Sequence, residues 1–213
     1  MKVDGSRAEY RCANLINLIS YAYGVSPARI SAPEWMSGMS SPRFDIITKI
    51  PDGGFEGQAR AMMQALLAER FRLVTHRAAT LQTMYALVVN GGLKMAASSD
   101  AESDPVEETS DSGRTQRWES PSISFDRLAD LLDRAMPLDA PVIDHTGVSG
   151  RYRLALEIAL NDLPGFGAPL EMENAVLARF NEGLGKLGLR LERRRGPVDT
   201  IVVDGAEKMP VQN

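Results

Sequence analysis

The chain of 213 residues has one cysteine, Cys12, and two histidines, His76 and His145. A single cysteine excludes an intramolecular disulfide and a structural zinc site built from several cysteines. The sequence patterns of common metal and phosphate sites are also missing, because no HExxH, CxxC or glycine-rich phosphate loop occurs. No cofactor is therefore predicted from motifs.

Long apolar runs and a surplus of basic residues are missing as well. A membrane-spanning helix needs about 20 largely apolar residues, so no membrane insertion is expected. The formal net charge is −4, which argues against nucleic-acid binding because phosphate contacts need clustered Lys and Arg. The dense basic run at 190–195 is interpreted as the solvated face of a strand. No export signal is recognised at the N-terminus.

The chain is similar to itself. Segments 10–30 and 123–143 align without a gap, and both have the i, i+3, i+4, i+7 apolar spacing of an amphipathic helix. Each copy continues with an alternating strand, a second helix and two further strands. We predict an α+β fold of two tandem, internally repeated β-α-β-β-α-β-β units, each a small mixed sheet with two helices on one face. The matched elements are 43–50 with 151–160, 57–69 with 170–186, 68–77 with 185–194, and 84–89 with 199–204.

Composition divides the chain into three parts. Residues 96–120 are rich in Ser, Asp and Glu and almost free of aliphatic residues, so this segment is predicted to be an acidic flexible linker. The first repeat unit is then predicted at 1–95 and the second at 121–213. Trp118 is the one expected anchor of the linker.

Seven segments of the chain are distinctive: LINLISYAYGV, RFDIITKIP, MMQALLAERFRLVTHR, YALVV, PVIDHTGVSGRYRL, GLGKLGLRLE and GPVDTIVVD. In this order they resemble a large family of uncharacterised proteins from acidobacterial and related soil bacteria, defined as a domain of unknown function. The resemblance implies a periplasmic or extracellular location, and it provides no catalytic motif. Family members have a strand before the first helix, which the short N-terminus here is expected to lack.

Each half is also loosely similar to the short N-terminal domain of secretins and TonB-dependent receptors, whose small units mediate protein contacts. This similarity and the edges of small sheets favour a binding or scaffolding module that captures a protein or peptide partner. Contact would use sheet edges or the cleft between the units, and self-association is a further option. Candidate binding residues are Trp35 in an apolar loop, Phe166 at a loop tip, and Tyr85 in the strand 84–89.

The alternative hypothesis is a small hydrolase of activated carboxyl or phosphate esters, with its site between the units. His145 would act as general base on Ser149 or on a water, with Asp144 or another acid orienting it. His76 is the second candidate. Two histidines and a carboxylate could also hold a divalent metal.

The peptide Asp144–Gly147 also has the composition of a tight turn, and we favour that interpretation. Side-chain oxygens of Asp and Thr bond the local backbone, and Gly accepts a positive φ. Adjacent strand residues point to opposite faces, so Asp144 is poorly placed to orient His145. Both functions stay open at this stage.

Overall fold

The structure is a computed structural model that describes residues 2–4, 7–38, 40–49, 56–110, 115–135, 139–159 and 169–211. The fold is α+β, as predicted. No helix in these ranges is long and apolar enough to cross a membrane. The α-helices are α1 (Leu15–Tyr23), α2 (Glu56–Phe71), α3 (Phe125–Ala135) and α4 (Pro169–Lys186), and short 3-10 turns cover Pro27–Arg29 and Glu34–Met36. The strands are β1 (Lys2–Asp4), β2 (Arg7–Ala13), β3 (Ile30–Ser31), β4 (Phe44–Lys49), β5 (Val74–Val89), β6 (Ala97–Ser98), β7 (Val106–Thr109), β8 (Thr115–Ile123), β9 (Val142–Asp144), β10 (Arg151–Ala159) and β11 (Leu189–Gly205).

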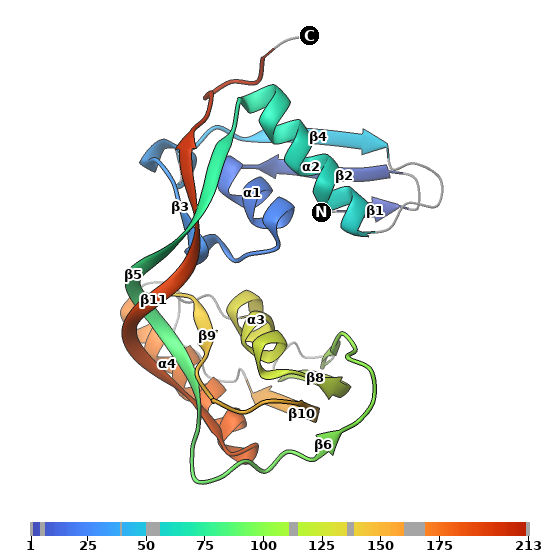
Figure 1. The fold of residues 1–213 in the computed structure, drawn as a ribbon, viewed down its shortest axis with the longest axis vertical. Helices are drawn as coiled ribbons and strands as arrows, with labels where there is room; N and C mark the ends of the chain where they lie inside the picture. The colour runs from blue at the N-terminus through green and yellow to red at the C-terminus, as the bar shows by residue number, and fades with distance from the viewer. Residues whose placement is uncertain are drawn as a thin grey trace. The chain divides into compact units, whose positions relative to one another are not determined.

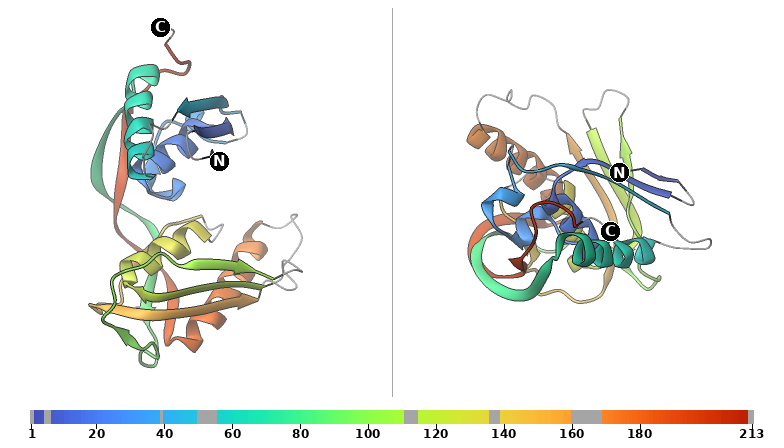
Figure 2. Two further views of the ribbon diagram at one scale, coloured as in Figure 1. Left: turned by 90° about the vertical axis from the view of Figure 1, so that its right-hand side faces the viewer. Right: turned by 90° about the horizontal axis from the view of Figure 1, so that it is seen from above.

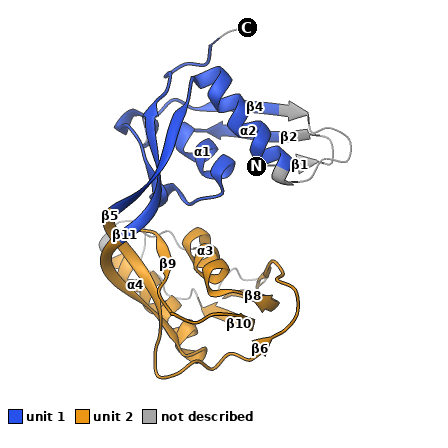
Figure 3. Cartoon of the chain, in the orientation of Figure 1, with its two compact units in different colours: residues 1–80, 197–213 blue, residues 81–196 orange. Residues whose placement is uncertain are grey.

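The chain forms two compact units (Figure 3). Unit 1 contains residues 1–80 and 197–213, and unit 2 contains residues 81–196. Both boundaries fall inside long strands, because β5 and β11 each pass from one unit into the other. The last segment of the chain therefore belongs to unit 1, a division that differs from the units at 1–95 and 121–213 expected from the sequence.

Unit 1 packs α1 and α2 beside an antiparallel sheet with the strand order β1-β2-β4 (Figures 1 and 2). Helix α1 begins after Asn14, whose side chain accepts the N–H of Asn17 at 2.9 Å, as an N-cap residue does. It ends at Gly24, whose φ of 65° suits glycine. The core of the unit also takes in Ile201 and Val203 from β11.

Unit 2 has a four-stranded sheet, in the order β6-β10-β8-β7, with one buried and one exposed face. Buried and exposed residues alternate along β10, as expected for the half-buried strand predicted at 151–160. On the buried face, the ring centroids of Trp118 and Phe180 lie 6.2 Å apart. The same core includes Tyr85 and Leu87 from β5.

A third sheet has the order β3-β11-β5-β9, with β3 parallel to β11 and β9 parallel to β5. The segments 84–89 and 199–204, predicted as separate strands, are parts of the continuous strands β5 and β11. The order of elements is β2-α1-β3-β4-α2-β5 in the first half of the chain and β8-α3-β9-β10-α4-β11 in the second. The internal repeat suggested by this order stays a prediction.

A strand precedes the first helix, contrary to the expectation from the short N-terminus. Strand β2 covers Arg7–Ala13 and pairs with both β1 and β4. Tyr10, which the self-alignment placed at the start of a helical segment, lies in this strand. The helical periodicity begins only at Leu15, after the N-cap.

The segment expected to be a flexible linker contributes three strands to unit 2. Strands β6 and β7 and most of β8 lie within 96–120, and Trp118 is buried in the core. The carboxylate of Glu102 accepts the N–H of Ser124 at 3.0 Å and its hydroxyl at 2.5 Å. Asp104 forms an ion pair with Arg127 of α3. Specific polar contacts, which composition does not reveal, hold this acidic segment to the start of α3.

Replacing Glu102 with glutamine is expected to lower the free energy of unfolding of unit 2 at pH 7 by about 0.5 kcal/mol, a small loss because the carboxylate is exposed. The hydrogen bonds from the Ser124 side chain and backbone lower the pKa of Glu102. Its stabilising effect is therefore present above the ordinary glutamate pKa and is lost as the pH falls through the lowered value. The measurement is urea unfolding at pH 7 and pH 3, followed by Trp118 fluorescence in a Trp35→Phe background.

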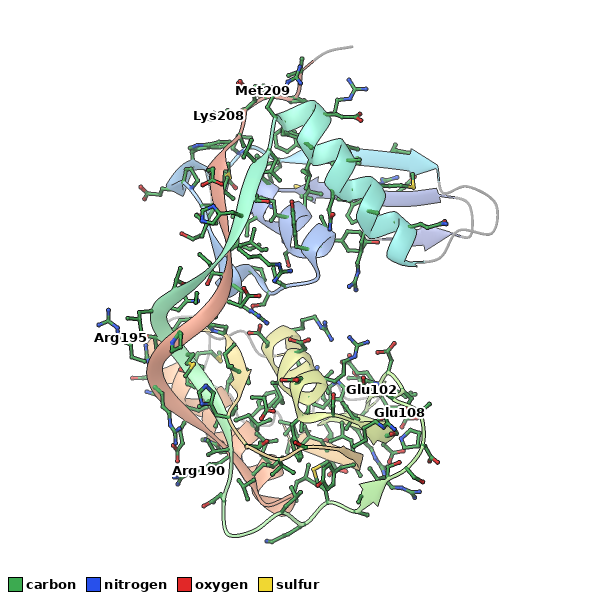
Figure 4. All side chains as sticks on the ribbon, viewed as in Figure 1. Glu102, Glu108, Arg190, Arg195, Lys208 and Met209 are labelled. Atoms are coloured by element: carbon green, nitrogen blue, oxygen red, sulfur yellow. The ribbon has the colours of Figure 1, made fainter. Side chains whose placement is uncertain are left out.

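Glu108→Gln on β7 is the matched control, because Glu108 is another exposed glutamate of the same acidic segment (Figure 4). Equal effects of the two substitutions at pH 7 would contradict a stabilising contact between Glu102 and Ser124.

Candidate functional site

An apolar groove of about 580 Å³ opens at strand β4 in unit 1. Strand β4 is the outermost strand of its sheet (Figure 1). Ile47 on this strand is 60% exposed, and Val211 of the C-terminal segment is exposed as well. The groove thus presents apolar side chains to solvent. Its lining residues are Phe44, Asp45, Ile46, Ile47, Leu66, Arg70, Phe71, Pro210 and Val211.

The C-terminal segment 206–211, which follows β11, helps to form this groove. The N–H of Glu207 donates to the carbonyl of Phe71 at 2.6 Å, and the N–H of Val211 donates to the carbonyl of Arg70 at 2.7 Å. The last carbonyls of a helix have no partner within the helix, so these two bonds satisfy groups that α2 leaves open. The segment 206–211 is therefore attached to the end of α2 and forms part of the groove wall.

The free edge of β4 makes this groove more than a surface depression. Among the described strands, β4 has β2 as its one neighbour, so its other edge presents unpaired N–H and C=O groups. The edge strands β1, β3, β6 and β9 have only two or three residues each. Strand β7 has four residues, which include Glu107 and Glu108. Short edges resist strand addition, and β4, with six residues and the exposed Ile47, is the longest of these edge strands.

Two ionisable side chains line the groove, Asp45 and Arg70. An oxygen of Asp45 accepts the N–H of Cys12 at 2.7 Å, at the irregular part of the β2–β4 pairing. A terminal nitrogen of Arg70 donates to the carbonyl of Val211 at 3.3 Å. A guanidinium has five N–H donors, so Arg70 retains the capacity to bind a further acceptor.

A second depression, of about 520 Å³, lies on the exposed face of the sheet in unit 2. Val106, Pro121 and Arg153 are among its lining residues. Arg117 and Glu119 form a 2.5 Å ion pair on the same strand, so this face is charged and solvated. The edge strand that borders it, β7, has only four residues, fewer than β4.

His145 lies in the connection that follows β9, where two local features expected for Asp144–Gly147 are present. Asp144 accepts the N–H of Thr146 at 2.8 Å, and Gly147 has a φ of 66°. The N–H of His145 donates to the carbonyl of Leu87, which extends the pairing of β9 with β5. In the described part of the chain, no hydrogen bond connects the His145 ring to Asp144.

Ser149, the proposed nucleophile, is exposed in the same connection between β9 and β10. Its carbonyl accepts the hydroxyl of Tyr152 at 3.4 Å, a weak contact. Among the described residues, no hydrogen bond joins its side chain to His145. The structure therefore provides no local nucleophile and base at this turn.

His76 lies on the part of β5 that belongs to unit 1. Its Nδ1 is 2.8 Å from one oxygen of Asp204, on β11, and 3.0 Å from the other. Both side chains are exposed, so this pair contributes little to stability. His76 and His145 belong to different units, and a joint site remains a prediction.

Tyr85 lies on β5, between β11 and β9, and is 1% exposed. Its hydroxyl donates to the carboxylate of Glu173 on α4, and Arg193 lies 3.9 Å from the same carboxylate oxygen. Arg193 also pairs with Asp139 at 2.9 Å. This cluster connects α4 to the strands of unit 2, and Tyr85 has almost no surface to offer a partner.

Of the two other candidate binding residues, Trp35 and Phe166, the structure describes only Trp35. Trp35 lies in the turn Glu34–Met36 and packs, partly buried, against the core of unit 1, where Met36 is fully buried. The loop that carries Trp35 therefore covers the core. Phe166 lies outside the described residues.

A metal site is not found within the described ranges, because no three or more His, Cys, Asp or Glu side chains gather there in a suitable group. The divalent metal considered for the hydrolase hypothesis stays a prediction. Among the described residues, no hydrogen bond joins His76 or His145 to a serine, threonine or cysteine side chain, and the hydrolase alternative stays a prediction.

Comparison with known proteins identifies the family. A family model described as a protein of unknown function, DUF3738, matches residues 16–206. The chain belongs to this family. The match covers most of both units and confirms the resemblance to a domain of unknown function, while the soil-bacterial origin and the secretin similarity stay predictions. No curated protein and no solved structure matches the chain.

The β4 groove of this DUF3738 protein was not identified from the sequence, although the strand was. RFDIITKI at 43–50 was predicted as a half-buried strand, and β4 covers Phe44–Lys49. The two consecutive isoleucines break the alternation, which places an apolar residue on the exposed face. This break was the available signal. The contribution of the C-terminal segment depends on contacts more than 130 residues apart in the sequence.

Replacing Tyr85 with phenylalanine is expected to destabilise unit 2 by about 1 to 2 kcal/mol at pH 8, because the largely buried Glu173 carboxylate loses its donor. Burial, the hydrogen bond to Glu173 and its charge raise the pKa of Tyr85. A raised pKa means that the stabilisation is complete below the ordinary tyrosine pKa of about 10 and is lost at higher pH. The difference between wild type and variant should therefore shrink from pH 9 to pH 11 in urea unfolding followed by Trp118 fluorescence.

Tyr152→Phe serves as the control, since it removes a hydroxyl with only a weak hydrogen bond in the same unit. If both variants gave the same dependence of stability on pH, the hydrogen bond between Tyr85 and Glu173 would not be the cause of the effect.

Proposed function

We propose that the protein binds an extended segment of a partner protein, which adds as a strand to the free edge of β4. The observation that carries this proposal is the coincidence of the longest described edge strand with an apolar groove along the same strand. The partner segment gains main-chain hydrogen bonds at the edge and places apolar side chains in the groove. A binding module of this kind agrees with the secretin-like character that the sequence predicts for each half. The location outside the cytoplasm rests on the family resemblance alone.

The magnitudes indicate that the groove is essential to binding. Ordering a six-residue segment costs about 1 kcal/mol or more of backbone entropy per residue. Backbone hydrogen bonds to one edge engage about every second residue and contribute about 1 kcal/mol each, which does not offset that cost. Apolar burial, at about 25 cal/mol per Å², has to provide the remainder. Affinity should therefore depend on the apolar contacts at Ile47.

Replacing Ile47 with lysine is expected to weaken peptide binding at least tenfold, because a charged side chain then lies beside the apolar groove. The probe is a fluorescein-labelled six-residue peptide of alternating threonine and valine with blocked ends, measured by fluorescence anisotropy. Wild type is expected to bind it with a Kd on the order of 100 μM. Val106→Lys is the matched control, because Val106 is 63% exposed on the glutamate-bearing edge strand β7.

Peptide N-methylation tests the strand geometry. In an added strand, alternate backbone groups face the protein, so methylating the amides that face β4 should abolish binding and methylating the others should leave it nearly unchanged. Equal sensitivity at all amides would exclude strand addition.

Sedimentation measures the oligomeric state and shows whether a second copy of the chain occupies the edge of β4. If wild type dimerises and Ile47→Lys is monomeric, a second copy occupies β4 and the peptide proposal is overturned. If the peptide binds neither protein, or binds Ile47→Lys as well as wild type, the proposal is also overturned.

A further inference from the structure

We propose that Arg70 makes the β4 groove selective for partner segments that carry an acidic side chain. This inference rests on the proposed function and specifies the chemistry of the segment that binds there. The supporting observation concerns the two ionisable side chains of the groove, Asp45 and Arg70. They differ in how strongly each is already hydrogen-bonded within the protein.

Asp45 is engaged within the protein. One of its oxygens accepts the Cys12 N–H at 2.7 Å, which connects β4 to the irregular part of β2. A short bond to a backbone N–H satisfies part of the carboxylate inside the sheet. Asp45 therefore serves the structure of unit 1, and its negative charge disfavours an acidic partner side chain close to it.

Arg70 is engaged much less. Its one described side-chain contact is the 3.3 Å hydrogen bond to the Val211 carbonyl, and no carboxylate among the described residues forms an ion pair with it. The planar guanidinium binds carboxylates through two parallel N–H donors, a geometry that a single carbonyl does not use. The groove thus contains a guanidinium with free N–H donors that can bind a carboxylate of a ligand.

The end of α2 provides an opposing effect, because the C-terminal end of a helix carries a partial negative charge of about half a unit. This effect is the smaller one here. The N–H groups of Glu207 and Val211 bond the carbonyls of Phe71 and Arg70, so these carbonyls already have donors. The full positive charge of Arg70, in the last turn of the helix, exceeds what is left of the dipole.

The apolar lining strengthens the preference. Phe44, Leu66 and Phe71 surround the groove, and a segment bound along β4 displaces water from it. A charge-assisted hydrogen bond is stronger where water is excluded, and a neutral or basic side chain leaves the Arg70 charge without a carboxylate partner. One acidic residue beside apolar residues is therefore the expected signature of the bound segment.

The test uses the threonine and valine peptide with glutamate placed in turn at each of its six positions, and matched glutamine and lysine versions. At one position, glutamate is expected to bind wild type about tenfold tighter than glutamine, and lysine more weakly than both. In Arg70→Gln the glutamate and glutamine peptides should bind with about equal affinity. Arg70→Lys should keep part of the preference for glutamate, and Arg70→Glu should bind the lysine peptide best.

Lys208→Gln is the charge control. Lys208 is exposed on the C-terminal segment and is not among the groove lining residues (Figure 4). Its loss should leave the ratio of glutamate to glutamine affinities unchanged, whereas general electrostatic attraction would be reduced equally by Lys208→Gln and Arg70→Gln. Circular dichroism checks that each variant is folded, and Arg70→Gln with Arg70→Lys decides the outcome if Arg70→Glu does not fold.

The outcomes separate the two proposals. If every peptide binds equally well and Ile47→Lys abolishes binding, strand capture stands and the acidic preference is overturned. If no peptide binds wild type, strand capture itself fails. A free C-terminal carboxylate has the same chemistry as an acidic side chain, so peptides with free and blocked C-termini are compared, and a preference seen only with free ends overturns the side-chain proposal.

Discussion

The two compact units depend on strands β5 and β11, which each pass from one unit into the other, and unit 1 takes the last part of β11 from the far end of the chain. Ile201 and Val203 of β11 belong to the core of unit 1, while Tyr85 and Leu87 of β5 belong to the core of unit 2. A small sheet with two helices buries too little apolar surface to lose such residues without a large loss of stability. The cores, the third sheet and the position of the C-terminal segment all follow from the course of these two strands.

The candidate site follows from the same constraint. Strand β11 carries the chain back into unit 1, where residues 206–211 bond the end of α2 and form part of the groove at β4. Without that return, the last carbonyls of α2 would lack these donors and the groove would lack part of its wall. The same short segment therefore meets a structural requirement and forms part of the proposed binding surface. Evolution of one would constrain the other.

Local patterns in the sequence predicted the elements well and their connections less well. The spacing of Leu15, Leu18 and Ile19 predicted α1, and the alternation at 151–160 predicted β10, because both patterns report burial of one face. The acidic composition of 96–120 was a poor guide, since Glu102 and Asp104 make specific bonds to Ser124 and Arg127. Composition describes average solvation and does not identify individual partners.

Sequence patterns could not predict that β5 and β11 each pass from one unit into the other, and the physical reason is a different one. The stretches 84–89 and 199–204 have the composition of strands, but the choice of partner strand depends on contacts far apart in the chain. The groove at β4 depends on such contacts as well. Of the candidate site residues, the local contacts of Asp144 and Gly147 were predicted from their chemistry, whereas Arg70 and Ile47 gain their proposed role only through the fold.

The return of β11 to unit 1 also has a consequence for protein synthesis. A ribosome delivers residues 7–80 long before residues 197–205, and tandem domains usually fold one after the other as they emerge. Here the core of the first unit is complete only when Ile201 and Val203 of β11 have been added, near the end of synthesis. The nascent polypeptide therefore exposes apolar surface for most of its elongation, and a helper that shields this surface during translation would be of most use to the half that is made first.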